Sequence, residues 1–270
     1  ERSRSPRSIA NAVLDLQFKG YKEVKLLGQN VNSYLWQGDK QEVNFRALLA
    51  MVAQTVPNMR IRFATSHPKD MNNDILRAIA THSNICKHIH LPFQSGSNSV
   101  LKDMNRKYSR EWYLDRIHAI REIVPDCGIS TDVFVGFHNE SEEDYQQTLA
   151  LMKEVMFDSA FMFKYSERPG TMASRNLPDN VDEDVKGRRL QELIDMQVEI
   201  SHQSNLKDVG KVFEVLVEGV SKKKSDELFG RSSQNKVIVF PDNGAKVGEL
   251  VQVRVTECTP ATLIGEAINQ

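Results

Sequence analysis

The first two hundred residues alternate between short runs rich in β-forming residues and longer segments with helical periodicity. The β-rich runs cover Glu23–Leu27, Arg60–Thr65, His88–Phe93, Ser130–Phe137 and Ala160–Tyr165. The helical segments cover Ser8–Lys19, Phe45–Thr55, Asn73–Thr81, Arg110–Ile123 and Glu142–Val155. Strands separated by helices of this length need crossover connections, which place neighbouring strands parallel. The pattern therefore predicts an α/β fold built on a parallel sheet or barrel.

The pattern changes in the last quarter of the chain. A long charged helix is expected from Val181 to Leu206. After it come five short β-rich runs, which are Phe213–Val220, Leu228–Arg231, Lys236–Phe240, Leu250–Val255 and Thr262–Ala267. Five strands in about sixty residues without helices are typical of a small, OB-like β-barrel. We therefore divide the chain into a first domain, residues 1–207, and a small all-β domain, residues 208–270.

Polar loops follow the predicted strands of the first domain. They are Gly28–Asn32, Ser66–Pro68, Gln94–Ser97, His138–Glu140 and Ser166–Thr171. The carboxyl ends of parallel strands meet at one rim of such a fold, which is where these folds place their chemistry. Each loop alone could be a simple turn, but together they predict a binding site at this rim.

Several classes of function are excluded. The chain has no G-x-S-x-G, P-loop or H-E-x-x-H motif. Its three cysteines, Cys86, Cys127 and Cys258, fit no metal-binding or disulfide spacing, so we expect them to be packing residues. His88 and His90 share a strand face, but packing or hydrogen bonding explains them better than a metal. No apolar run is long enough to span a membrane and no secretory signal is present, which predicts a cytoplasmic protein.

The loop sequences resemble those of a known family. The segments are Leu26–Tyr34, Thr65–Pro68, His90–Ser97, Met104–Tyr108, Asp132–Phe137 and Tyr165–Ala173. In this order they are similar to the strand-end signatures of the MiaB-type tRNA methylthiotransferases, which are radical S-adenosylmethionine (radical SAM) enzymes. The tail, including Gly230-Arg231-Ser232, resembles the TRAM domain of that family. The resemblance covers practically the whole chain and implies a partial, TIM-like (β/α) radical-SAM barrel followed by a TRAM barrel.

Two features refine this resemblance. The sister enzymes that modify a ribosomal protein carry different sequences where Gly28–Asn32 and Thr65–Pro68 stand, which favours the tRNA branch. The chain also departs from the family pattern. It lacks the C-x-x-x-C-x-x-C loop and the earlier three-cysteine domain that hold the family's two clusters. His138-Asn139 replaces the usual Pro-Gly pair before Glu140, so the backbone of that loop is expected to differ.

The resemblance implies a reaction and its cofactors. The reaction is radical-based methylthiolation of C2 of N6-isopentenyladenosine next to the tRNA anticodon. The implied cofactors are S-adenosylmethionine and two 4Fe-4S clusters in the full-length protein, with ligands upstream of this chain. The implied partners are tRNA and an electron donor such as flavodoxin, and the protein is expected to be a monomer. This fragment alone is expected to be inactive, and no catalytic side chain is assigned.

Two sets of residues are candidates for binding. Cofactor contacts are expected from rim residues that offer close backbone approach, neutral hydrogen bonds or charge, which are Gly28, Gln29, Asn30, Ser66, His67, Gln94, Ser95, Asp132, Gly136 and Arg168. RNA contacts are expected from basic and aromatic residues near the two ends, which are Arg2, Arg4, Lys222, Lys223, Lys224, Phe229 and Arg231. Phe213 and Phe240 are expected in the core of the small barrel.

Three alternatives remain open. A barrel lyase or aldolase would need a lysine or metal-binding carboxylates at the strand ends, whereas Lys25 and Lys164 lie on strands. A methylthiotransferase acting on a ribosomal protein would share the architecture. A non-catalytic RNA-binding protein would keep the tail but would hold no iron.

Overall fold

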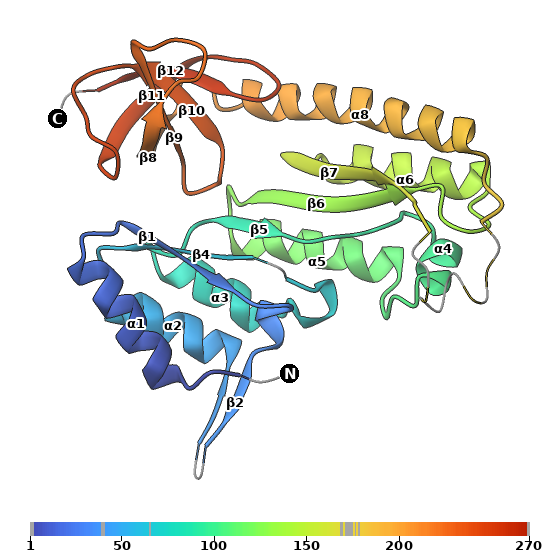
Figure 1. The fold of residues 1–270 in the computed structure, drawn as a ribbon, viewed down its shortest axis with the longest axis horizontal. Helices are drawn as coiled ribbons and strands as arrows, with labels where there is room; N and C mark the ends of the chain where they lie inside the picture. The colour runs from blue at the N-terminus through green and yellow to red at the C-terminus, as the bar shows by residue number, and fades with distance from the viewer. Residues whose placement is uncertain are drawn as a thin grey trace.

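The computed structural model describes residues 3–38, 41–64, 66–167, 170, 175, 177 and 179–268. A larger α/β domain is joined through one long helix to a small β-barrel (Figure 1). No helix within these ranges is long and apolar enough to cross a membrane.

The α/β domain is built on five parallel strands. Strand β1 (Glu23–Leu27) pairs with β4 (Arg60–Ala64), and β5 (His88–His90), β6 (Gly128–Val135) and β7 (Ser159–Lys164) form a second parallel sheet in that order. An isolated parallel bridge between Ile61 and Ile85 joins β4 to the segment before β5. Among the described residues β1 and β7 each have a single neighbour, so the curved sheet is open. This matches the partial barrel that was expected.

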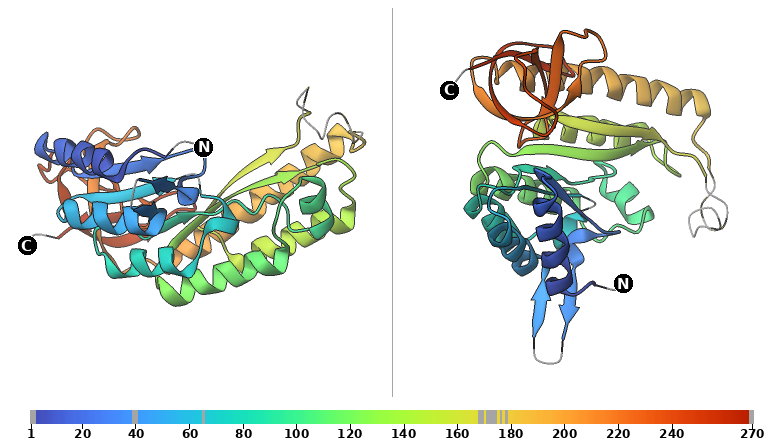
Figure 2. Two further views of the ribbon diagram at one scale, coloured as in Figure 1. Left: turned by 90° about the horizontal axis from the view of Figure 1, so that it is seen from below. Right: turned by 60° about the vertical axis from the view of Figure 1, so that its left-hand side comes forward.

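Seven α-helices accompany these strands in the described part of the chain. They are α1 (Pro6–Phe18), α2 (Phe45–Thr55), α3 (Asn73–Thr81), α4 (Asn98–Asp103), α5 (Arg110–Ile123), α6 (Glu142–Val155) and α8 (Glu183–Leu206). Five begin at a Ser or Asn whose side chain accepts a hydrogen bond from a backbone N–H of the first turn. The first six helices lie on the convex side of the sheet, whereas α8 runs beside β7 toward the small barrel (Figures 1 and 2).

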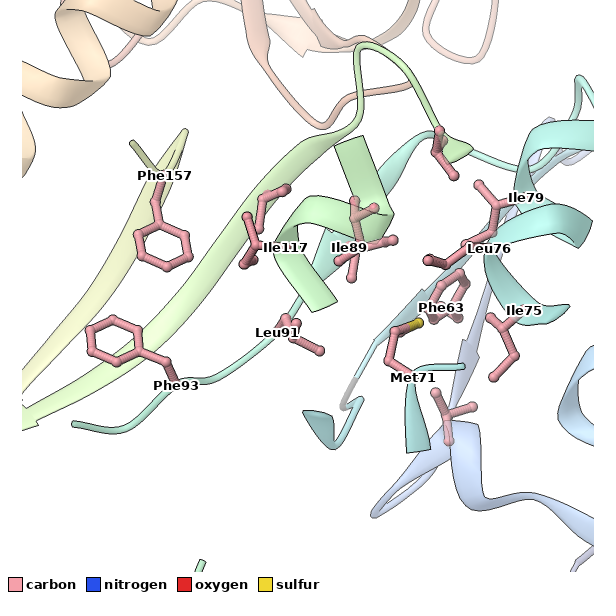
Figure 3. Close-up of a cluster of buried hydrophobic side chains, with 14 of the residues drawn as sticks. Phe63, Met71, Ile75, Leu76, Ile79, Ile89, Leu91, Phe93, Ile117 and Phe157 are labelled. Atoms are coloured by element: carbon pink, nitrogen blue, oxygen red, sulfur yellow. The ribbon is translucent and has the colours of Figure 1, made fainter. Parts of the chain in front are cut away.

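The main core lies between the sheet and these helices. Ile61 and Phe63 of β4 and Ile89 of β5 are buried against side chains of α3 and α5 (Figure 3). Phe93 stacks on Phe157 with ring centroids 5.5 Å apart. Because side chains alternate along a strand, Arg60, Arg62, His88 and His90 are left on the concave face. The strands therefore separate an apolar, helix-covered face from a polar one.

The tail forms a closed barrel. Its strands are β8 (Val212–Val220), β9 (Glu227–Arg231), β10 (Val237–Pro241), β11 (Leu250–Cys258) and β12 (Leu263–Ala267), in the order β10-β12-β11-β8-β9. Inward residues such as Val215, Leu228 and Val253 make its core. Phe240 is buried in this core and Phe213 packs against the core, as predicted for both residues.

Some elements differ from expectation. A hairpin of β2 (Leu35–Gln37) and β3 (Glu42–Asn44) was not predicted, and neither were helix α4 and the 3-10 turns Val31–Ser33 and Pro68–Asp70. The predicted strand His88–Phe93 ends at His90, although Leu91 N–H still donates to Ser130 O. Strand β6 ends at Val135 because Gly136 turns the chain with φ of +74°.

Candidate functional site

The first two rim loops are held together by asparagine side chains. Asn32 accepts a hydrogen bond from His67 N–H at 2.9 Å and donates to His67 O at 3.0 Å. Asn30 also accepts from His67 N–H, at 3.1 Å, and donates to the Asp70 carboxylate at 2.8 Å. Two backbone groups of His67 are thus satisfied by the loop after β1, so the loops after β1 and β4 form one unit.

Gln94 joins the next two loops. It has a left-handed backbone, with φ of +69°. Its N–H donates to Asp132 O and its carbonyl accepts from Phe134 N–H, which ties the loop after β5 to β6. Its side-chain oxygen accepts from Arg106 at 2.7 Å. Burial and then the charge of Arg106 lower the pKa of His67 from its usual value.

The loop after β6 is fixed by a buried ion pair. Glu140 lies 2.9 Å from Arg189 of α8 and accepts a hydrogen bond from Gly136 N–H. A Cβ on Gly136 would lie 2.3 Å from Lys186 Cγ. Glycine is therefore required here by the packing of α8 and by the positive φ. A cofactor contact of the Gly136 backbone stays a prediction.

The departure at His138-Asn139 has a structural explanation. Asn139 has a φ of +60°, a conformation that glycine adopts without strain and that asparagine tolerates best among other residues. Asn180 accepts from Asn139 N–H at 2.9 Å and donates to the Asn139 side chain at 2.8 Å. Buried His138 lies 2.8 Å from the Tyr165 hydroxyl, which links this loop to the end of β7. Asn139 thus takes a glycine-like conformation.

The concave face below the rim carries Asp132 and two histidines. His90 lies 3.4 Å from the Asp132 carboxylate, and both His88 and His90 hydrogen-bond to the Ser130 hydroxyl, at 3.0 and 2.9 Å. Hydrogen bonding therefore accounts for the histidine pair, as expected. Within the part of the chain that the structure describes, no three His, Cys, Asp or Glu side chains form a possible metal site.

Aromatic residues of β7 share this face and were missed by the sequence analysis. Phe161 and Phe163 are 57% and 45% exposed, and Phe163 stacks on Phe134 at 5.1 Å between ring centroids. The sequence did contain a sign of them. Phe161 and Phe163 alternate with Ala160 and Met162, which indicates a strand with an aromatic face and an aliphatic face.

The rim carries polar groups that are available to a ligand. The Ser66 side chain is only 5% exposed, yet its hydroxyl has no hydrogen-bond partner among the described residues. An unpaired buried hydroxyl costs about 1–3 kcal/mol, and a bound ligand would remove that cost. Gly28 and Gln29 are exposed in the loop after β1, the strand that pairs with β4, and partly exposed Asp132 offers a carboxylate for an ammonium or hydroxyl group.

The remaining predicted rim residues are placed differently. The Ser95 hydroxyl lies 3.5 Å from that of Thr148 on α6, underneath the rim. A Cβ on Gly96 would lie 2.4 Å from Gln147 O, so this loop is seated directly on α6. A cofactor contact of Ser95 stays a prediction. Arg168, like Arg2 of the RNA set, lies outside the described residues.

The predicted RNA-binding residues lie in two separate places. Lys222, Lys223 and Lys224 are exposed in the loop after β8, and Lys224 pairs with Glu227 at 2.8 Å. On the same barrel, Phe229 covers Gly219 and Arg231 lies 3.4 Å from Glu218. Arg4 is exposed and binds Ser8. The N-terminus, which is close to Arg4 in sequence, lies away from the small barrel in Figure 1.

Two grooves lie away from the rim, where the two domains meet. One of about 400 Å³ is lined by residues that include His88, Phe161 and Arg231, and another of about 440 Å³ by residues that include Arg60 and Lys236. Because these residues belong to the domain junction, we do not assign the cofactor to either groove.

Known proteins support this architecture. The profile of the Radical SAM superfamily matches residues 1–152, and that of the TRAM domain matches residues 206–268. Coproporphyrinogen III oxidase (HemN) from Escherichia coli, a radical SAM enzyme, superposes with a TM-score of 0.51 and 16% identity, covering 86% of this chain and 61% of that one. At that identity the likeness concerns the fold alone. The radical-SAM and TRAM folds that the sequence implied are thereby confirmed.

Curated relatives are similar along practically the whole chain. The tRNA-2-methylthio-N(6)-dimethylallyladenosine synthase of Phocaeicola vulgatus is 60% identical over 99% of this chain. The protein of that name from Parabacteroides distasonis is 60% identical over 100% of it. This chain spans 59% of the length of each. With a matching profile over more than half its length, the chain belongs to the radical SAM superfamily and resembles MiaB-type proteins from end to end.

Proposed function

We propose that this chain is the barrel and tail of a tRNA-2-methylthio-N6-dimethylallyladenosine synthase. The proposed reaction is methylthiolation of C2 of N6-isopentenyladenosine next to the anticodon of tRNA. The observation that carries this proposal is 60% identity over 268 residues to a protein of that name. We place the domain boundary between residues 207 and 208, between the end of α8 and the start of β8.

The rim residues have distinct proposed roles. When bound, S-adenosylmethionine with a 4Fe-4S cluster supplies the hydrogen-abstracting chemistry and the methyl group. The Ser66 hydroxyl and the Asp132 carboxylate would bind polar groups of this cofactor. Asn30, His67 and Gln94 hold the loops in register through the hydrogen bonds described above, and the exposed backbone of Gly28 allows close approach.

The cluster ligands are proposed to lie in the part of the relatives that this chain does not span. We propose two 4Fe-4S clusters for the full-length protein. The three cysteines here are poor ligands, because ligation needs a thiolate. Burial raises the pKa of the Cys86 thiol and raises that of Cys127 to about 12. Cys258 is partly buried against the core of the small barrel.

Further partners follow from this assignment. We propose that the TRAM barrel binds tRNA through the loop 222–224, Phe229 and Arg231, assisted by Arg2 and Arg4 of the first domain. We also propose an electron donor such as flavodoxin, a monomeric enzyme, and a cytoplasmic location, where tRNA is modified.

The function can be tested in cells that lack this gene. Complementation with the full-length gene should restore 2-methylthio-N6-isopentenyladenosine, measured by mass spectrometry of tRNA nucleosides. Anaerobically reconstituted full-length protein should contain two 4Fe-4S clusters by iron analysis. Unchanged nucleoside content in the deletion strain would refute the assignment, and an iron-free protein would favour a non-catalytic RNA-binding role.

Ser66 allows a sharper test of the cofactor site. Because its hydroxyl has no partner among the described residues, Ser66→Ala should leave the free energy of unfolding unchanged or slightly raised. The same change should weaken S-adenosylmethionine binding to the reconstituted full-length protein about tenfold, the effect of losing one hydrogen bond of about 1–1.5 kcal/mol. Ser225→Ala, in an exposed loop of the small barrel, is the matched control.

A further inference from the structure

The turn between β9 and β10 is seated on the amino ends of the barrel strands. We call residues 232–236 the docking turn. Arg62 of β4 donates to Ser232 O at 2.6 Å and to Ser233 O at 3.1 Å. Lys87 N–H, just before β5, donates to the Ser233 hydroxyl at 2.9 Å. The small barrel is thus bound to the edge of the sheet opposite the rim (Figure 1).

A second arginine of the same strand extends this contact. Arg60 donates to Arg231 O at 2.9 Å and to the backbone and carboxylate oxygens of Glu214 at 2.6 and 2.9 Å. Arg62 also forms an ion pair with Glu23 of β1 at 2.9 Å. The two arginines are only 7% and 6% exposed. Buried charges are costly unless partners satisfy them, and here both domains supply those partners.

The shape of the junction is equally specific. A Cβ on Gly128, at the start of β6, would lie 2.5 Å from Gln234 O of the docking turn. Gly128 is in extended backbone and has no positive φ. The absence of a side chain is therefore required by the approach of the turn and not by backbone conformation.

A third contact fixes the small barrel to the end of α8. Lys236, the last residue of the docking turn, donates to the Ser204 hydroxyl of α8 at 3.0 Å and lies 3.2 Å from Asp158, just before β7. Asn205 donates to the carbonyls of Thr259 and Pro260 at 2.9 and 3.2 Å. Together with the bonds from Arg60 and Arg62, these contacts hold the small barrel at separate points and leave it little freedom to rotate.

We propose that Arg60, Arg62 and Gly128 are positioning residues that set the orientation of the TRAM domain relative to the rim. Strand β4 carries the arginines at its amino end and leads to Ser66 beyond its carboxyl end. At about 3.3 Å per residue, strand β4 spans about 13 Å between Arg60 and Ala64. A tRNA held by the TRAM domain therefore meets the rim at a set distance. This inference rests on the proposed function.

The docking itself can be tested without RNA. Gly128→Ala removes no hydrogen bond but places a methyl group against the docking turn. In the 270-residue chain it should speed amide exchange about tenfold, a loss of about 1.4 kcal/mol of local protection, in peptides spanning 84–90 and 230–237. Gly187→Ala on α8 is the control, because nothing lies within 4 Å of its added Cβ. Unchanged exchange in Gly128→Ala would overturn the proposed docking.

The arginines provide a second, independent variant. Arg60→Gln/Arg62→Gln should separate the unfolding of the two domains into two calorimetric transitions. Arg77→Gln should not, because Arg77 is exposed and forms its ion pair with Asp74 of the same helix. If the double variant does not fold, Gly128→Ala still decides the question. If the double variant unfolds in a single transition and its amides exchange as slowly as those of the parent chain, the arginines do not hold the two domains together.

Activity distinguishes positioning from simple stabilisation. In the full-length enzyme, Gly128→Ala should lower kcat/KM about ten- to a hundredfold on whole tRNA, the range expected for a misplaced substrate. An isolated anticodon stem-loop, which lacks the rest of the tRNA, should react equally with the parent and the variant. Equal losses on both substrates would overturn the positioning role. Absence of methylthiolation by the parent enzyme would instead refute the proposed function and leave the exchange result intact.

Discussion

His88 makes the stability of the fold depend on pH. Burial, followed by the charge of Arg62, lowers the pKa of His88 to about 3. In the unfolded chain a histidine has a pKa of about 6.5. Between pH 6.5 and 3 His88 is protonated in the unfolded chain but neutral in the folded chain. The contribution of neutral His88 to stability is therefore complete above pH 6.5 and is lost as pH falls toward 3. Each pH unit in this window is worth about 1.4 kcal/mol, so lowering the pH to 5 should cost about 2 kcal/mol.

Urea unfolding at pH 7.5 and 5.0 measures this loss. His88→Gln should remove about 2 kcal/mol of the pH-dependent loss, because the glutamine amide can still bond to the Ser130 hydroxyl but does not titrate. His118→Gln, at an exposed position of α5, should keep the pH dependence of the parent chain. If His88→Gln destabilises as steeply with acid as the parent, burial of a neutral His88 is not the cause.

Three further changes have defined outcomes. Glu140→Gln removes the buried carboxylate that faces Arg189, whose other carboxylate partner is the half-exposed Glu142, and should cost about 1–3 kcal/mol in urea unfolding. Exposed Glu143→Gln should cost under about 1 kcal/mol, and equal losses from the two variants would refute this difference. Gly96→Ala meets Gln147 O and should cost about 1–3 kcal/mol, so an unchanged thermal midpoint would contradict the close packing. Replacing residues 222–224 by glutamine should reduce the slope of log K for tRNA against log salt concentration by up to about 2, and an unaltered slope would place this loop away from the RNA.

The bounds of the long helices could be predicted from the sequence because the residues that determine them lie within or next to each helix. Helices Phe45–Thr55, Asn73–Thr81, Arg110–Ile123 and Glu142–Val155 begin and end where predicted, since each combines an amphipathic period with a capping side chain. The hairpin of β2 and β3 was missed because strands of three residues are too short to show alternation. Helix α4 was missed because it follows a loop rich in Ser and Gly.

The sequence predicted which loops form the site, but it did not predict which side chains contact one another there. That the loops share a rim follows from the parallel topology alone. That Ser95 faces α6 and Gly136 faces Lys186 depends on helices distant in sequence, which no local pattern reveals. Likewise, the alternation Arg60-Ile61-Arg62-Phe63 indicates a strand with one polar face, but nothing in it indicates that another domain covers that face.

The open sheet has a practical consequence for work with the isolated chain. Strand β1 pairs on one side only among the described residues, and Leu27 at its end is 69% exposed. The unpaired edge of a strand presents free amide and carbonyl groups that can recruit a strand from another molecule. We therefore expect concentrated solutions of this chain to form oligomers through strand addition. Co-expression with the rest of the proposed full-length protein should suppress them.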